Sequence, residues 1–129
     1  MNRNYSKLLD LAKEASANAY NPYSKFNVGA AVLYEDGTIY KGCNVENASY
    51  GLCLCAERNA LSTAIVEGNK TKPVAVAIYS PNTKLCYPCG ACRQWIAEFN
   101  YAADIILEDE NSEVVVYNIS ELLPKSFYL

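Results

Sequence analysis

The chain has 129 residues, a length typical of one folded domain, and we expect residues 1–129 to form a single domain. Hydrophobic residues make up 51% and charged residues 19%, a composition that excludes a disordered chain. The net charge of −3 argues against binding to a nucleic-acid backbone, which would favour a basic surface. The N-terminal residues contain no signal-peptide core, and no apolar run reaches the roughly 18 residues of a membrane span, so we expect a cytoplasmic protein with no membrane contact.

The first half of the chain predicts a helix, a hairpin and a second helix. Apolar residues recur three and four positions apart over 4–19, which predicts an amphipathic helix. Residues 28–34 and 38–43 read as two strands joined by a turn at Asp36-Gly37. Residues 55–66 have helical composition, and Gly68 fits the end of that helix.

The second half predicts three strands and two helices. Residues 74–79 are uniformly apolar, as in a buried central strand, and residues 89–100 are again helical, with Pro88 suited to the helix start. Strands are expected at 103–107 and 113–117, and a short helix at 120–123 with Ser120 as its cap. The alternation predicts an α/β fold, a three-layer α/β/α sandwich with a mixed sheet of about five strands.

The chain has six cysteines and no histidine, so a metal site would have to use thiolates or carboxylates. A set of three disulfides is disfavoured, because a chain of this length builds a core without them and a reducing compartment keeps thiols free. Cys89 and Cys92 form a C-x-x-C motif, and Cys86 makes a second, overlapping one. The remaining cysteines are Cys43, Cys53 and Cys55.

Two of the cysteine groups fall at predicted helix starts, where the helix dipole and free N–H groups favour a thiolate. Cys55, Cys89 and Cys92 would fill three tetrahedral positions of a zinc ion and leave the fourth for water, as in a catalytic zinc site. Glu57 lies two residues after the first of these cysteines and could carry protons beside that water. By spacing alone, Cys53 or Cys86 could replace one of the three ligands.

Five sequence blocks resemble the small cytidine deaminases, the short homotetrameric kind with a three-cysteine zinc site. The resemblance runs in order from about Tyr20 to Phe127. The blocks are PYSKFNVGAA at 22–31, GCNVENASY at 42–50, CAER at 55–58, CGACRQ at 89–94 and ELLP at 121–124. The resemblance selects Cys55, Cys89 and Cys92 as ligands of one Zn²⁺ per chain and leaves the other three cysteines as buried or bystander thiols.

The resemblance implies hydrolytic deamination of cytidine and deoxycytidine to uridine and deoxyuridine plus ammonia, in pyrimidine salvage. Glu57 would carry protons from the zinc-bound water to N3 and to the leaving amine. The zinc site with three thiolates has a formal charge of −1, which the two helix starts offset, and Arg58 would hydrogen-bond the ligand sulfurs.

Binding roles also follow from the resemblance. Phe26 would pack on the pyrimidine, Asn44 and Glu46 would hydrogen-bond the ribose hydroxyls, and the backbone at Ala56 and Cys89 would hold the polar edge of the base. Three further residues would lie near a neighbouring subunit's site in a homotetramer: Ala48, Tyr50 and Phe127.

Alternative functions remain at this point. A deaminase of blasticidin S or of a base in RNA would share the same chemistry, although the acidic composition disfavours RNA. A structural zinc module would need a fourth ligand such as Cys53 or Cys86, and a thiol redox protein could use Cys89 and Cys92. Tyr87 and Trp95 depart from the usual pattern of the resembled family near the second cysteine group, which leaves the substrate preference open.

Overall fold

A five-stranded mixed sheet forms the centre of the computed structural model, which describes residues 5–129. The strand order is β2-β1-β3-β4-β5, with β3 in the middle as its apolar sequence predicts. Strands β3 and β4 run parallel and the other neighbours are antiparallel. The strand bounds are β1 Gly29–Tyr34, β2 Ile39–Cys43, β3 Pro73–Tyr79, β4 Asp104–Glu108 and β5 Val114–Asn118.

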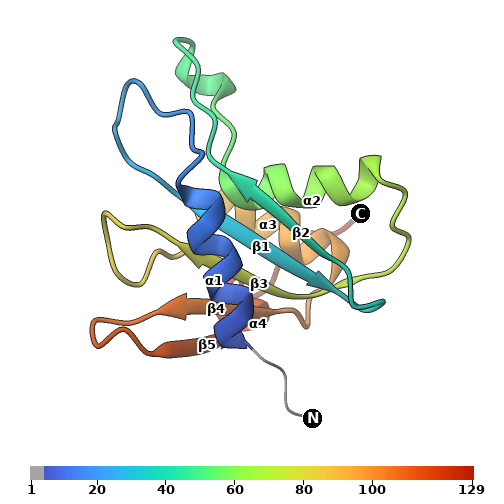
Figure 1. Ribbon diagram of the computed structural model, residues 1–129. Coiled ribbons are helices and arrows are strands. Elements are labelled where there is room, and N and C mark those ends of the chain that lie inside the picture. Colours follow the sequence, from blue (N-terminus) through green and yellow to red (C-terminus); the bar gives the residue numbers. More distant parts are fainter. Residues whose placement is uncertain (1–4) are drawn as a thin grey trace.

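Helices cover both faces of this sheet, so the predicted three-layer α/β/α sandwich is confirmed. In Figure 1, α1 crosses in front of the sheet while α2 and α3 lie behind it. The helices are α1 Tyr5–Ser16, the short 3₁₀ helix η1 Tyr50–Leu52, α2 Ala56–Val66, α3 Gly90–Phe99 and α4 Ile119–Leu122.

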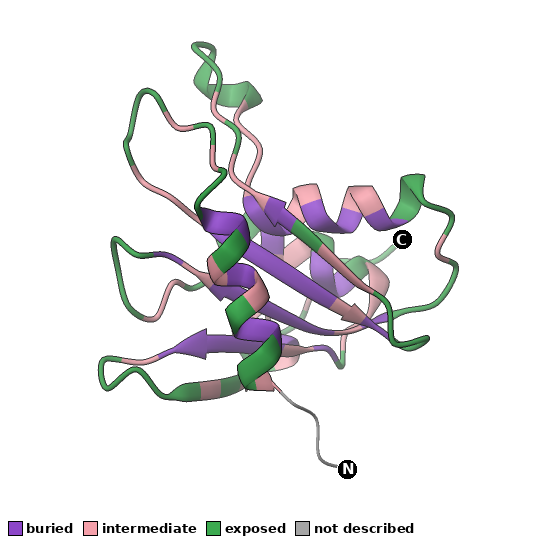
Figure 2. Cartoon of the chain, viewed as in Figure 1, coloured by how far each residue is buried: buried purple, intermediate pink, exposed green. Residues whose placement is uncertain are grey.

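The hydrophobic core is divided by the sheet into two clusters. On one face, Leu8, Leu9 and Ala12 of α1 pack on small strand residues such as Ala31 and Ala77. On the other face, α2, α3 and α4 pack on larger strand side chains of β1, β3 and β4. Figure 2 shows buried residues continuing along the strands and along the inner sides of the helices. Burial of both sheet faces stabilises the packing of the helices on the sheet, and this packing fixes where α2 and α3 begin.

Three local features differ from the sequence prediction. The first helix ends at Ser16, not at residue 19, because residues 17–19 make i→i−3 bonds and Tyr20 then pairs with Val45. The predicted start of that helix at Asn4 lies outside the described residues. The 3₁₀ helix η1 was not predicted, since it has too few residues to show a period.

The cap of α4 is Asn118, two residues before the predicted cap Ser120. The Asn118 side chain accepts a hydrogen bond from the Ser120 N–H at 3.1 Å, and the Glu121 carboxylate accepts one from the Asn118 N–H at 2.8 Å. This is a reciprocal capping box, which sequence could have shown from the asparagine and the glutamate three residues later.

Candidate active site

The starts of α2 and α3 meet at one end of the sheet and bring three cysteines together. Cys55 is the N-cap of α2 and Cys89 is the N-cap of α3, and both have extended backbone. Cys92 is the third residue of α3 and is fully buried. Neither N-cap cysteine makes a side-chain capping bond, so neither sulfur is held by the backbone of its own helix.

The spacing of the three sulfurs fits a zinc ion. The Sγ atoms of Cys55, Cys89 and Cys92 all lie within 4.8 Å of one another, and the Cys55 and Cys89 sulfurs are 3.7 Å apart. Tetrahedral zinc with Zn–S bonds of about 2.3 Å requires sulfurs about 3.8 Å apart. Three thiolates with the fourth position left to water or substrate are the donor set of a catalytic zinc site.

The surroundings favour the thiolate form at Cys55. Hydrogen bonds from Cys92 and Arg58 lower the pKa of Cys55 to about 5, against an opposing effect of burial. The same hydrogen bond to Cys55 raises the pKa of Cys92, because a single proton is held between the two sulfurs. The N–H groups of the two helix starts add positive potential at the cluster. A divalent cation there would take the place of that shared proton.

Arg58 reaches the cluster from the first turn of α2. Its Nη2 donates to the Cys55 sulfur at 3.3 Å. Three thiolates and one Zn²⁺ together would have a charge of −1, and the Arg58 guanidinium would compensate that charge. The Arg58 Nε is buried and has no hydrogen-bond partner among the described residues. The predicted contact between Arg58 and a ligand sulfur is therefore present in the structure.

Glu57 lies beside the sulfurs with its side chain almost entirely buried, at 3% exposure. Burial raises the pKa of Glu57 to about 7, and the Cys55 thiolate adds to this effect. Glu57 also lines an open cavity together with Cys55 and Cys89. Glu57 and two of the three clustered cysteines therefore line the same space.

This cavity has a volume of about 260 Å³. Its lining includes every residue that the sequence assigned to substrate binding: Phe26, Asn44, Glu46 and Ala56. Cys53 and Cys86, the possible alternative ligands, and Tyr87, noted near the second cysteine group, also line the cavity. Three further lining residues were not assigned to the site by the sequence: Val28, Val45 and Leu54. Val28 could have been noticed, because it stands two residues after Phe26 in the same sequence block.

Asn44 and Glu46 also hold the wall that carries Phe26. The Asn44 side chain accepts from the Val28 N–H at 2.9 Å and donates to the Phe26 carbonyl at 2.8 Å. The Glu46 carboxylate accepts from the backbone N–H groups of Tyr23 and Ser24 at 3.0 and 3.1 Å and from the Ser24 hydroxyl. These bonds lower the pKa of Glu46, with the Ser24 hydroxyl as the largest cause. Both residues therefore position the cavity wall, whatever they bind in addition.

The two competing cysteines lie at the cavity but outside the sulfur cluster. Cys53 donates from its sulfur to the Asn47 carbonyl at 3.6 Å and accepts from the Asn47 N–H at 3.4 Å. Burial raises the pKa of Cys86 to about 11, which keeps it a neutral thiol. Within residues 5–129, the group with metal-binding geometry is formed by the three cysteines that the resemblance selected.

The three residues expected near a neighbouring subunit do not line this cavity. Tyr50 and Phe127 are 73% and 66% exposed, and Ala48 is exposed in the loop before η1. The Tyr50 ring contacts Tyr23, and the Phe127 carbonyl accepts from Gln94 at 3.0 Å. The chain by itself does not bring these side chains to its own site.

A close contact between β2 and α2 sets the position of the first helix start. A Cβ atom at Gly42 would lie 2.4 Å from the Ala56 carbonyl oxygen and 2.6 Å from the Ala60 nitrogen. Only glycine lets the strand approach the helix this closely. The residue type at position 42 therefore controls where Cys55 and Glu57 lie relative to the sheet.

Comparison with known proteins identifies the family to which this site belongs. Residues 2–108 match the family model described as the cytidine and deoxycytidylate deaminase zinc-binding region. The chain belongs to this deaminase family. It is 44% identical over 122 residues to the cytidine deaminase of Sporosarcina psychrophila, covering 94% of this chain and 89% of that protein.

Solved structures of the deaminase family share the fold. The crystal structure of cytidine deaminase from Burkholderia pseudomallei matches with a TM-score of 0.90 and 41% identity, covering 97% of this chain and all of that one. A more distant relative, the blasticidin-S deaminase of Bacillus cereus, is 30% identical over 129 residues, covering 94% of this chain and 90% of that protein. The expected family, a deaminase with a three-cysteine zinc site, is confirmed.

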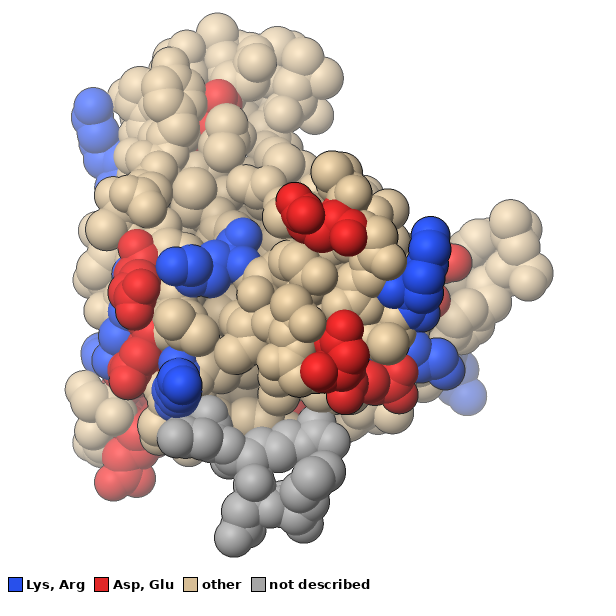
Figure 3. All heavy atoms as spheres, turned by 45° about the vertical axis from the view of Figure 1, so that its right-hand side comes forward, with Lys and Arg blue, Asp and Glu red and all other residues tan. Residues whose placement is uncertain are grey.

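Two further observations on this deaminase concern its surface charge and its helices. Acidic and basic side chains are interspersed on the face drawn in Figure 3, without one sign dominating it. Among the described residues, no helix is both long enough and apolar enough to cross a membrane.

Proposed function

We propose that this chain catalyses the hydrolytic deamination of cytidine and deoxycytidine to uridine and deoxyuridine plus ammonia, in pyrimidine salvage. The observation that supports this proposal most strongly is that Glu57 lines the same cavity as Phe26 and as Cys55 and Cys89, two cysteines of the sulfur cluster. Residues 1–129 would form a single catalytic domain. When bound, zinc would lower the pKa of a coordinated water so that hydroxide is available near neutral pH.

Glu57 would act as the proton carrier of this reaction. It takes a proton from the attacking water and delivers it to N3 as the water oxygen bonds to C4 of the cytosine ring. The second proton of that water then passes through Glu57 to the exocyclic amine. The C4–N bond breaks, ammonia leaves, a C4 carbonyl forms and the proton on N3 remains in the product. The nearly complete burial of Glu57 supports this role, because bulk water is kept away from the carboxyl group.

Substrate binding would use the two walls of the cavity. Phe26 packs on the pyrimidine ring, and the N–H and carbonyl groups at Ala56 and Cys89 hold the polar edge of the base. Asn44 and Glu46 would hydrogen-bond the ribose hydroxyls. Their bonds to the cavity wall leave part of their hydrogen-bonding capacity unused, because an amide or carboxylate oxygen has two lone pairs and a carboxylate has two oxygens.

The direct test is the change in ultraviolet absorbance when purified protein is mixed with cytidine. We expect the cytidine band to be lost, and Glu57→Gln to lower kcat by at least about 100-fold with zinc content unchanged. Equal kcat in the Glu57→Gln protein would refute the proton-carrier role. Zinc at one per chain with no turnover of cytidine would refute the proposed substrate, and blasticidin S, the substrate named for one relative, would be assayed next.

We further propose that the active form is a cytoplasmic homotetramer. Large apolar side chains of Tyr50 and Phe127 are exposed on the single chain, and burying them against neighbouring subunits would remove that apolar surface from water. Ala48, Tyr50 and Phe127 would then contribute to a neighbour's site. Analytical ultracentrifugation tests this directly, and a monomer that is fully active at micromolar concentration would contradict it.

A further inference from the structure

The segment 80–88 connects the two walls of the cavity. It leaves the end of β3 and leads to Cys89 at the start of α3. Near its beginning, the Asn82 side chain accepts a hydrogen bond from the Asn27 N–H at 2.8 Å. Asn27 lies between Phe26 and Val28, and both of these line the cavity. The first end of the segment therefore contacts the Phe26 wall.

The other end of the segment forms the opposite part of the lining. Cys86 and Tyr87 line the cavity and lead directly to Cys89. Just before them, Leu85 has a φ of +49°, the left-handed region that a branched side chain rarely adopts. The Leu85 N–H donates to the Glu108 carbonyl at 2.9 Å, and the Leu85 carbonyl accepts from the Tyr87 N–H at 2.8 Å. A strained backbone of this kind persists only where surrounding contacts hold it.

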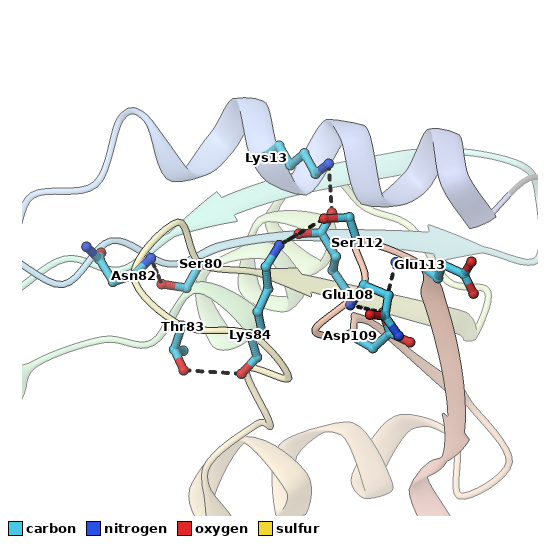
Figure 4. Close-up of polar contacts among 10 residues, drawn as sticks. Lys13, Ser80, Asn82, Thr83, Lys84, Glu108, Asp109, Ser112 and Glu113 are labelled. Atoms are coloured by element: carbon cyan, nitrogen blue, oxygen red, sulfur yellow. Dashed lines mark hydrogen bonds and ion pairs between the residues drawn. The ribbon is translucent and has the colours of Figure 1, made fainter.

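A buried carboxylate holds the middle of this segment. Glu108, at the end of β4, is only 6% exposed. Its Oε1 pairs with the Lys84 ammonium from the segment, and its Oε2 pairs with the Lys13 ammonium from α1 at 2.9 Å. Figure 4 shows the two lysines reaching Glu108 from different elements, with Asn82 and Ser80 on the same segment as Lys84. Both lysine side chains are about 40% exposed, at 40% and 41%.

We propose that the Lys84–Glu108 ion pair positions the substrate cavity. By fixing segment 80–88 to the sheet, the pair keeps the Phe26 wall and the Cys86–Cys89 wall at the separation that the nucleoside requires. Lys84 is a positioning residue, because it lies outside the cavity lining and acts through Asn82 at one end of the segment and Leu85 at the other. The inference rests on the proposed function for its substrate.

Lys13 supplies a matched control. It pairs with the same carboxylate and is exposed to nearly the same degree as Lys84, but it belongs to α1, and its second contact is with the Tyr79 ring at the end of β3, 5.3 Å from Nζ, and not with a residue of segment 80–88. Lys13→Met and Lys84→Met therefore each remove one lysine from Glu108, and the other lysine still pairs with the carboxylate. If the two ion pairs with Glu108 served only to stabilise the fold, both variants would have the same effect on KM.

The experiment compares steady-state deamination of cytidine by the two variants and by Asn82→Ala, with zinc content and thermal midpoint measured on each. Lys84→Met and Asn82→Ala are expected to raise KM about two- to fivefold, the range that one ion pair or hydrogen bond supplies, with kcat and zinc content unchanged. Lys13→Met is expected to keep the KM of the unaltered protein. Equal KM values in the two lysine variants, or KM values that follow the thermal midpoints, would overturn the inference.

A second measurement does not depend on the substrate. Amide hydrogen exchange should become faster at residues 26–28 and 85–89 in Lys84→Met but not in Lys13→Met, since only the first variant releases the segment. Unchanged exchange at both regions would overturn the positioning role. If the unaltered protein fails to deaminate cytidine, the proposed function fails, and the exchange comparison still decides whether Lys84 holds the cavity walls.

Discussion

Replacement of Gly42 by alanine should reduce catalysis strongly without unfolding the protein. The added Cβ would lie 2.4 Å from the Ala56 carbonyl oxygen, whereas ordinary contact begins near 3.4 Å, so α2 would have to move away from β2 by about 1 Å. The start of α2 carries Cys55 and Glu57, so this movement displaces the proposed zinc ligand and the proposed proton carrier together. A displacement of about 1 Å at reacting groups costs on the order of 100-fold in rate.

The assay is kcat/KM for cytidine in Gly42→Ala, with the free energy of unfolding measured in parallel. We expect kcat/KM to fall about 100-fold, while overpacking lowers the free energy of unfolding by about 1–3 kcal/mol. Gly90→Ala is the matched control: Gly90 adjoins the proposed zinc ligand Cys89, and a Cβ there meets nothing within 4 Å. The reasoning is refuted if Gly42→Ala keeps the activity of the unaltered protein, or if both glycine variants lose activity equally.

Three further outcomes follow from the site and its surroundings. Arg58→Gln should lower kcat by about 10-fold or more while zinc is retained, because the charge facing the Cys55 sulfur is lost; unchanged kinetics would remove this role. Cys89→Ser should lose zinc, measured by atomic absorption, whereas Cys53→Ser should keep it, and zinc retained in Cys89→Ser would contradict the ligand assignment. The ion pairs lower the pKa of Glu108, with the Lys84 hydrogen bond as the largest cause, so its contribution to stability is present above the unfolded pKa of about 4.3 and is lost as the pH falls through the lower folded value. Thermal melts of Glu108→Gln should therefore show reduced stability at pH 7 and a difference from the unaltered protein that shrinks as the pH falls below about 4.3; a difference independent of pH would contradict it.

Local patterns in the sequence were sufficient for the elements and for the chemistry of the site. Apolar periodicity located α1, because hydrophobic burial follows the period of the helix. Helical composition located α2 and α3, and the continuous apolar run located β3 at the centre of the sheet. The glycine after α2 marked its end and has a φ of +82°, a conformation that glycine adopts without strain. The types and spacing of Cys55, Glu57, Cys89 and Cys92 already indicated zinc chemistry, since few other residues supply that donor set.

The tertiary structure decided which of the six cysteines come together and what surrounds them. Spacing alone left Cys53 and Cys86 as possible ligands, and the resemblance favoured Cys55, Cys89 and Cys92. The meeting of two helix starts, far apart in the chain, is what brings these three sulfurs together and leaves the two cavity thiols outside the cluster. The contacts of Gly42 with α2 and of Lys84 with Glu108 join residues 14 and 24 positions apart, so no local pattern could show them. Burial of Glu57 likewise depends on packing between layers. The residue types of the chain determine which chemistry is available. The packing of the helices on the sheet sets the distances between groups that are far apart in the sequence, and it therefore determines where that chemistry takes place.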